Sequence, residues 1–149
     1  MKTPKRYLVP ADYMADPSVH VFNDRIYIYP SHDVDVDCPD DDDGEQYKME
    51  DYHILSMDSL DSECVDNGLA LSEKDVPWVG RQLWAPDAVK VNGKYYLVFP
   101  AKDKDDIFRI GVATSDRPEG PFKAEESFIL GSFSIDPAVL VDDDDKAYI

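Results

Sequence analysis

The sequence has 149 residues, of which 32 are Asp or Glu and 15 are Lys or Arg, so its formal net charge is -17. Binding to nucleic acids or to anionic membranes depends on Lys and Arg, and this charge therefore argues against both partners. No apolar run approaches the roughly 18 residues of a membrane span. The 43% of hydrophobic residues argues against a disordered acidic protein and favours a folded domain.

The clearest pattern is a hairpin that occurs three times along the chain. The first copy spans residues 15–30 and has a polar turn at Asn23-Asp24. The second spans residues 85–100 and turns at Asn92-Gly93, a strong signal for a two-residue hairpin loop. The third spans residues 135–149 and turns at a run of four Asp residues. Each copy opens with an Asp beside a Pro and continues with β-branched residues, which favour strands.

Further strands are predicted between the hairpins. Residues 52–56 are a strand candidate, and residues 108–115 alternate with period two. Residues 117–122 have the composition of a turn, and no long stretch has a helical pattern. About four strands in each repeat of roughly 50 to 70 residues predict an all-β fold built of propeller blades.

A propeller blade buries its faces only against neighbouring blades, and a closed ring leaves no exposed sheet edge. Two blades and one hairpin make an incomplete ring. We therefore expect residues 1–149 to be the N-terminal part of a single propeller domain that continues beyond Ile149.

An acidic stretch follows the first hairpin. Residues 33–45 contain eight acids and no base, with a D-x-D-x-D pattern at the start. A calcium-binding EF-hand loop needs Gly at its sixth position and Glu at its twelfth, where this chain has Cys38 and Gly44. We therefore predict a solvated loop in this stretch rather than a calcium site.

The cysteines predict neither a metal site nor a cofactor. Cys38 and Cys64 form no C-x-x-C motif and have no His at a spacing typical of zinc sites. We expect two free thiols in a cytoplasmic protein, because reducing compartments keep cysteines unpaired.

Asp16 and Asp136 occupy matching places, each directly before a Pro at the start of a strand. Pro favours an extended conformation in the preceding residue, and the innermost strands of different blades converge near the axis of a propeller. Two carboxylates at that point suit glycoside hydrolysis, in which one activates water and another protonates the leaving oxygen. On spacing alone, the pattern favours the simpler alternative, in which Asp-Pro only begins a strand and the Asp side chain caps a turn.

The segments around these aspartates carry a resemblance to a known family. In order they are A-D-P-S-V at residues 15–19, W-A-P-D at 84–87, the stretch 110–122 and I-D-P at 135–137. Together they closely resemble the N-terminal half of glycoside hydrolase family 43, which includes β-xylosidases, α-L-arabinofuranosidases and arabinanases. The resemblance implies a five-bladed β-propeller, of which this chain covers about the first two blades and the start of the third.

The resemblance also implies an inverting mechanism that acts on β-xylosidic or α-L-arabinofuranosidic bonds in hemicellulose oligosaccharides. Asp16 matches the general base of the family, and Asp136 matches the residue that tunes the pKa of the acid. The general acid is a Glu expected beyond Ile149, so the fragment alone should be inactive. Glu119 lies in a surface turn and is not assigned this role.

Sugar-binding residues are predicted beside the two aspartates. Trp84 of the W-A-P-D motif is expected to form the wall of the sugar pocket, because C–H faces of sugars stack on aromatic rings. His32-Asp33 follows the first hairpin and is a candidate for contacts with substrate hydroxyls, although a turn role fits equally well. Asp87 is expected to be structural, and His20 and His53 to be ordinary packed or surface histidines.

Two other functions remain open from the sequence. A propeller of lectin type binds carbohydrate without catalysis and does not need two aspartates at the axis. Enzymes of the fructosidase type are retaining, and their first motif reads N-D-P-N-G instead of the A-D-P-S-V found at residues 15–19.

Overall fold

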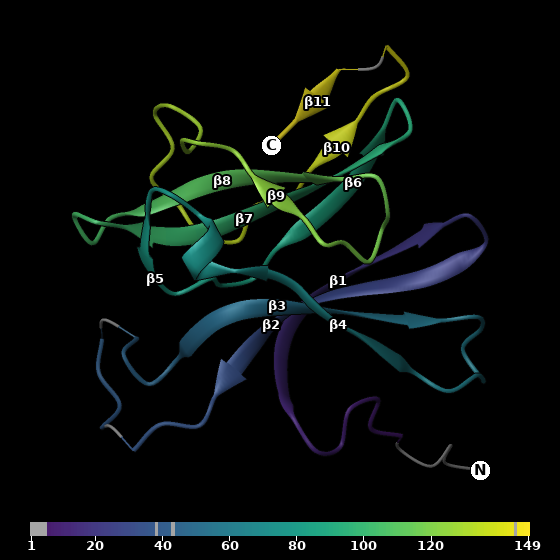
Figure 1. The fold of residues 1–149 in the computed structure, drawn as a ribbon, viewed down its shortest axis with the longest axis horizontal. Helices are drawn as coiled ribbons and strands as arrows, with labels where there is room; N and C mark the ends of the chain where they lie inside the picture. Colours follow the sequence, from purple (N-terminus) through teal and green to yellow (C-terminus); the bar gives the residue numbers. More distant parts are fainter. Residues whose placement is uncertain (1–5, 38, 43, 145) are drawn as a thin grey trace.

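The computed structural model describes residues 6–37, 39–42, 44–144 and 146–149. These residues form two stacked antiparallel sheets and a short third hairpin (Figure 1). The helical content of this part is one 3-10 turn, η1 (Glu73–Asp75), and no helix in it is long and apolar enough to cross a membrane. Cys64 is a free thiol, whereas Cys38 lies outside the described residues.

The first sheet contains four strands in the order β1-β2-β3-β4. Its first hairpin turns at Asn23 and Asp24, as predicted, and both residues have the positive φ angles that a tight hairpin turn requires. The sequence did not single out β4. The strands are β1 (Tyr13–Phe22), β2 (Arg25–Val34), β3 (Lys48–Met57) and β4 (Val65–Ser72).

The second sheet has the order β5-β7-β8-β9. β5 pairs with the end of β7, and β6 pairs with the first half of the same strand. The predicted turn at Asn92-Gly93 joins β6 to β7, and the predicted strand at 108–115 is β8. The third hairpin is short and pairs β10 with β11. The strands are β5 (Val79–Arg81), β6 (Asp87–Val91), β7 (Lys94–Asp103), β8 (Phe108–Ser115), β9 (Lys123–Ala124), β10 (Leu140–Val141) and β11 (Ala147–Tyr148).

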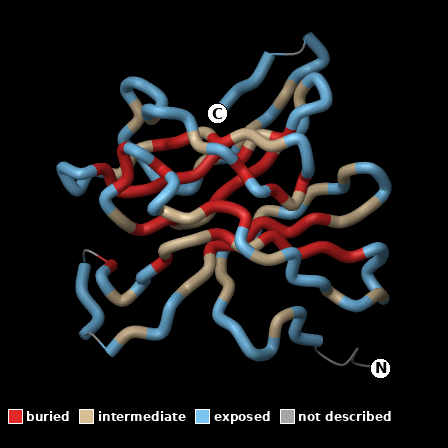
Figure 2. The backbone as a smooth tube through the Cα atoms, in the orientation of Figure 1, coloured by how far each residue is buried: buried red, intermediate tan, exposed pale blue. Residues whose placement is uncertain are grey.

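The main core lies between the two sheets, where Figure 2 shows the buried backbone concentrated. Tyr52 of β3 packs edge-on against Phe99 of β7, with ring centroids 6.1 Å apart. The Tyr29 hydroxyl donates a hydrogen bond of 2.7 Å to the carbonyl of Pro118, which ties the first sheet to the turn after β8. The first strands of the successive hairpins are also in contact, β1 with β6 and β6 with β10. The starts of the three hairpins therefore lie side by side.

The start of β1 departs from a regular strand. Ala15 pairs with Ser31 and Ser18 with Tyr29, so Asp16 and Pro17 together lie opposite Pro30. This is a β-bulge, and it suits two prolines, which have no N–H to contribute to the strand ladder.

The bulge corrects one prediction. We expected extended geometry for the residues before Pro, but Asp16 has a φ of 45° and Asp136 a φ of 53°. The preference of a pre-proline residue is outweighed at Asp16 by the extra residue in the bulge, which turns the backbone into the left-handed region.

The position of His32 and Asp33 also differs from the prediction. Both lie inside β2, which continues to Val34, rather than after the hairpin. Because Pro30 faces the bulge, it does not interrupt the ladder, and the strand extends through it. The predicted acidic loop therefore begins after Val34, and its Asp43 lies outside the described residues.

Candidate active site

The starts of the three hairpins surround a cavity of about 250 Å³. Four of the five predicted site residues line it, and they come from β1, β2, the segment before β6 and the segment before β10. Six further residues line the cavity, and two of them add large side chains that the sequence did not single out. The four predicted residues are Asp16, Asp33, Trp84 and Asp136, and the two large side chains are Tyr47 and Met49.

Asp16 and Asp136 have closely similar local geometry. Both are exposed, both precede a Pro, and both have the positive φ that non-glycine residues rarely adopt. They also line a second hollow together with Asp87. Strained backbone of this kind clusters at active sites, because the surrounding structure holds a side chain in a required direction. The two D-P motifs are therefore equivalent in conformation as well as in sequence.

Asp33 presents an unsatisfied acceptor in the cavity wall. Its Oδ1 is buried and has no hydrogen-bond partner among the described residues. Burial raises the pKa of the Asp33 carboxyl, and the nearby N–H of Val34 offsets this only in part. A buried acceptor without a donor is costly, so this oxygen is suited to accept a hydrogen bond from a ligand hydroxyl.

Trp84 is fixed as an aromatic wall. Its indole N–H donates a 3.2 Å hydrogen bond to the carbonyl of Tyr47, and its ring packs against Phe108 with centroids 4.5 Å apart. The Tyr47 ring stands edge-on to it at 6.3 Å. The indole face is thus held in one orientation beside the carboxylates.

Gly44 supports Trp84 from behind. A Cβ atom at this position would lie 2.9 Å from Cη2 and Cζ2 of Trp84, and the φ of Gly44 is +75°. Only a glycine satisfies both constraints without strain. The sequence contained no sign of this contact, because Gly44 stood out only as a residue that breaks the EF-hand pattern.

Asp87 joins the first strands of the three hairpins. Its Oδ1 lies 2.6 Å from Nε2 of His20 in β1, and its Oδ2 accepts a 2.8 Å hydrogen bond from the N–H of Val139 just before β10. The N–H of Ala88 donates to Oδ1 as well. Burial would raise the pKa of Asp87, but these hydrogen bonds outweigh it and leave the pKa below its usual range. These contacts match the structural role predicted for Asp87.

His32 does not line the cavity. Its Nδ1 lies 2.5 Å from Oδ1 of Asp51, and its Nε2 lies 3.2 Å from both carboxylate oxygens of Asp12. Adjacent residues of a strand point to opposite faces, so His32 and Asp33 cannot both face the cavity. The expected contact of His32 with substrate therefore does not follow from its placement.

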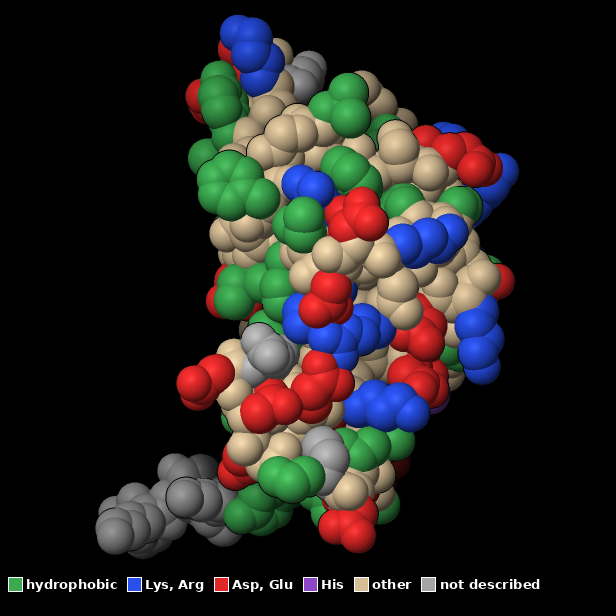
Figure 3. All heavy atoms as spheres, turned by 90° about the vertical axis from the view of Figure 1, so that its left-hand side faces the viewer, with side chains coloured by type: hydrophobic (Ala, Val, Ile, Leu, Met, Phe, Trp, Pro, Cys, Tyr) green, Lys and Arg blue, Asp and Glu red, His purple; other side chains and the backbone are tan. Residues whose placement is uncertain are grey.

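The high negative charge is not gathered at the cavity alone. The face in Figure 3 carries acidic side chains interspersed with Lys and Arg. Arg81 exemplifies this mixing, since it pairs with Asp106 at 2.8 Å and also contacts Glu45 at the end of the acidic stretch. The face in Figure 3 therefore carries a mixed rather than a uniformly negative charge.

Residues 8–149 match the family model described as glycosyl hydrolases family 43. This match covers almost the whole chain. The chain belongs to glycoside hydrolase family 43. The resemblance found in the motifs is thereby confirmed.

Curated relatives in family 43 are similar over most of this chain. Xylosidase/arabinosidase 43A of Humicola insolens is 61% identical over 139 residues, which are 92% of this chain and 42% of that protein. Xylosidase/arabinosidase of Bacteroides ovatus is 57% identical over 150 residues, covering 100% of this chain and 46% of the relative. The chain spans less than half the length of these relatives.

Solved structures of family 43 enzymes share the fold. A β-xylosidase/α-arabinofuranosidase from a compost microbial metagenome, in complex with xylotriose, has a TM-score of 0.90 and 62% identity, covering 94% of this chain and 42% of that one. The enzyme from Xanthomonas citri complexed with xylotriose has a TM-score of 0.84 and 53% identity, covering 94% and 40%. These matches confirm the predicted β-propeller fold, with this chain forming its first blades.

Proposed function

We propose that this chain is the N-terminal part of an inverting glycosidase that hydrolyses β-xylosidic or α-L-arabinofuranosidic bonds in oligosaccharides. The observation that carries the proposal is that Asp16, Asp136 and Trp84 line one and the same cavity. Relatives named xylosidase/arabinosidase, and the similar enzymes complexed with xylotriose, support the substrate class.

Asp16 is the proposed general base. Its exposed carboxylate can take a proton from a water molecule as that water attacks the anomeric carbon. An inverting enzyme separates its acid and base by roughly 6.5 to 9.5 Å, which leaves room for this water. The general acid is assigned to a Glu outside this chain, on the far side of the glycosidic bond.

Asp136 is the proposed modulator of that acid. A carboxylate near a second carboxyl group raises its pKa by repulsion between like charges and so keeps it protonated near neutral pH. The equivalent backbone geometry of Asp16 and Asp136 allows the two residues to face one sugar ring from the first and the third blade.

Asp33 and Trp84 are proposed to hold the sugar. The unpaired Oδ1 of Asp33 accepts a hydrogen bond from a sugar hydroxyl. The indole of Trp84 stacks on the C–H face of the ring. Together they fix the orientation of the sugar ring relative to the water that attacks its anomeric carbon.

The direct test is hydrolysis of aryl β-D-xylosides and aryl α-L-arabinofuranosides by the full-length protein that contains this chain. We expect release of the aryl group from at least one of the two series. No release from either series, with oligosaccharide binding retained, would favour the non-catalytic carbohydrate-binding propeller.

The Gly44 contact gives a second prediction. Gly44→Ala in the full-length protein should lower kcat/KM by about tenfold or more, because the new methyl group displaces the Trp84 ring from the sugar. Steady-state kinetics on an aryl β-D-xyloside measures this effect.

Gly93→Ala is the matched control for Gly44→Ala. Gly93 has a φ of +82°, so both variants suffer similar backbone strain, but a Cβ at Gly93 meets nothing within 4 Å. We expect Gly93→Ala to lose some stability, on the order of 1 kcal/mol, and to keep its activity. Equal activities of the two variants would show that Trp84 does not position the substrate.

A further inference from the structure

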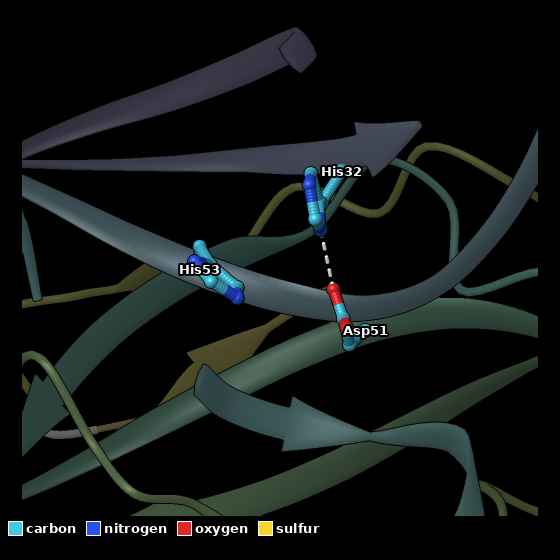
Figure 4. Close-up of side chains that lie close together, drawn as sticks. All are labelled: His32, Asp51 and His53. Atoms are coloured by element: carbon cyan, nitrogen blue, oxygen red, sulfur yellow. Dashed lines mark hydrogen bonds and ion pairs between the residues drawn. The ribbon is translucent and has the colours of Figure 1, made fainter. Parts of the chain in front are cut away.

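A cluster of two histidines and an aspartate lies outside the cavity. His32 comes from β2, and Asp51 and His53 come from β3, and one possible ligand atom from each lies within 4.8 Å of the others. Figure 4 shows the three side chains close together, His32 beside β2 and Asp51 and His53 over β3, with the interaction between His32 and Asp51 marked. The imidazole rings of His32 and His53 have centroids 4.8 Å apart.

Strand pairing explains why these three side chains meet. His32 is the direct cross-strand partner of Asp51, and Asp51 and His53 are two residues apart in β3, so all three share one face of the sheet. Tyr52, which lies between Asp51 and His53, points the other way into the core against the second sheet. The cluster therefore occupies the face of the first sheet that is turned away from the second.

Each imidazole is held by a second carboxylate on its other nitrogen. Asp12 lies 3.2 Å from Nε2 of His32, and Asp66 of β4 lies 3.0 Å from Nδ1 of His53. These contacts leave Nδ1 of His32 and Nε2 of His53 for a ligand on the Asp51 side. Metal-binding histidines characteristically have this arrangement, in which an outer carboxylate accepts the remaining N–H and fixes the tautomer and the ring orientation.

We propose that His32, Asp51 and His53 bind a divalent transition-metal ion, with Zn²⁺ as the ion best matched to the donors. Two imidazoles and one carboxylate suit zinc, whereas Ca²⁺ and Mg²⁺ prefer oxygen ligands throughout. The metal replaces the proton shared by His32 and Asp51, and a water molecule completes a tetrahedral site.

The required movement is small. Bonds of roughly 2.0 to 2.2 Å to a tetrahedral zinc ion place neighbouring ligand atoms about 3.3 Å apart. The ligand atoms already lie within 4.8 Å of one another, so the most separated pair closes by about 1.5 Å. Rotation about the side-chain bonds of the three residues can make a shift of this size.

The ion would join β2 to β3 and, through the outer carboxylates, engage Asp12 before β1 and Asp66 in β4. A ligand that binds only the folded state stabilises it in proportion to its concentration and affinity. The site is separate from the cavity that contains Asp33, and it does not depend on the proposed glycosidase activity.

Isothermal titration of the full-length protein, first stripped of metal with a chelator, tests the site. We expect Zn²⁺ to bind and His53→Gln and Asp51→Asn each to weaken this binding at least tenfold. Asp58→Asn is the control, because Asp58 is an exposed acid just after β3 that contacts Arg25 rather than the cluster. That variant should bind Zn²⁺ like the wild type, and Ca²⁺ should not compete.

Three further measurements keep the result unambiguous. Far-UV circular dichroism of the stripped variants checks that they are folded, and Asp66→Ala, which alters only an outer carboxylate, should weaken zinc binding about 10- to 100-fold. Co²⁺ in place of zinc should give the visible absorption of a tetrahedral site, lost in His53→Gln. The proposal fails if the wild type takes up no Zn²⁺, or if folded His53→Gln and Asp51→Asn bind it as tightly as the wild type.

Discussion

Asp16→Asn in the full-length protein should lower kcat by roughly 10²- to 10⁴-fold, the usual loss when a positioned general base is removed. The amide has nearly the same shape as the carboxylate but cannot accept the proton of the attacking water. Because Asp16 is exposed at a left-handed position that Asn also tolerates, the melting temperature should stay close to that of the wild type. Steady-state kinetics and thermal melting measure the two effects.

Asp24→Asn is the matched control for this substitution. Asp24 is also exposed and also has a positive φ, of 62°, but it lies at the opposite end of β1, in the turn to β2. We expect this variant to retain wild-type kcat. Near wild-type turnover in Asp16→Asn would remove Asp16 from the role of base, whatever the control shows.

The second large effect is expected on stability. Asp87→Ala should lower the free energy of unfolding by about 3 kcal/mol, because it removes the shared partner of buried and half-buried hydrogen-bonding groups in three segments at once. The lost partners are His20, Ala88 and Val139. Chemical denaturation at neutral pH measures the loss, and an unchanged midpoint would show that Asp87 does not hold the hairpins together.

The pH dependence of the same residue sharpens this test. The pKa of Asp87 is lowered in the folded protein, so its stabilising contribution is present above its unfolded pKa of about 3.9 and is lost as the pH falls through the folded value. Asp87→Asn retains the shape but has no charge to titrate. The gap in stability between wild type and Asp87→Asn should therefore be largest near neutral pH and shrink below about pH 4.

Turn chemistry explains which parts of the fold were predictable. Asn23-Asp24 and Asn92-Gly93 specify tight hairpins through residues that tolerate positive φ, and the flanking alternation specifies the strands. β4 has no such local signal. Its sequence includes Asn67 and Gly68, which read as a loop, and it forms a strand because β3 offers a free edge to pair with.

The candidate site was predictable where a motif carried it. Asp16, Trp84 and Asp136 stand in recognisable motifs, and the structure brings them to one cavity. Tyr47 and Met49 belong to no motif. They line the cavity because the chain after the acidic stretch returns to the sheet there and begins β3. The φ of Asp16 depends on the register between β1 and β2, which the sequence does not specify locally.

The histidine cluster was missed for a related reason. His32 and His53 lack the close sequence spacing of a zinc motif, and they become neighbours only through the pairing of β2 with β3 across a long connection. His32 and Asp33 were assigned one role because they are adjacent in sequence. Within a strand, adjacency places them on opposite faces, one toward the cluster and one toward the cavity.

Direct attack by a water molecule activated at Asp16 inverts the anomeric carbon, whereas a nucleophilic Asp retains its configuration through two displacements. Proton NMR during hydrolysis of an aryl β-D-xyloside, or of the corresponding α-L-arabinofuranoside, by the full-length protein distinguishes these outcomes before the sugar mutarotates. We predict that α-xylose, or β-arabinose, appears first. First appearance of the anomer with the configuration of the substrate would contradict the assignment of Asp16 as a general base and indicate a retaining enzyme of the fructosidase type.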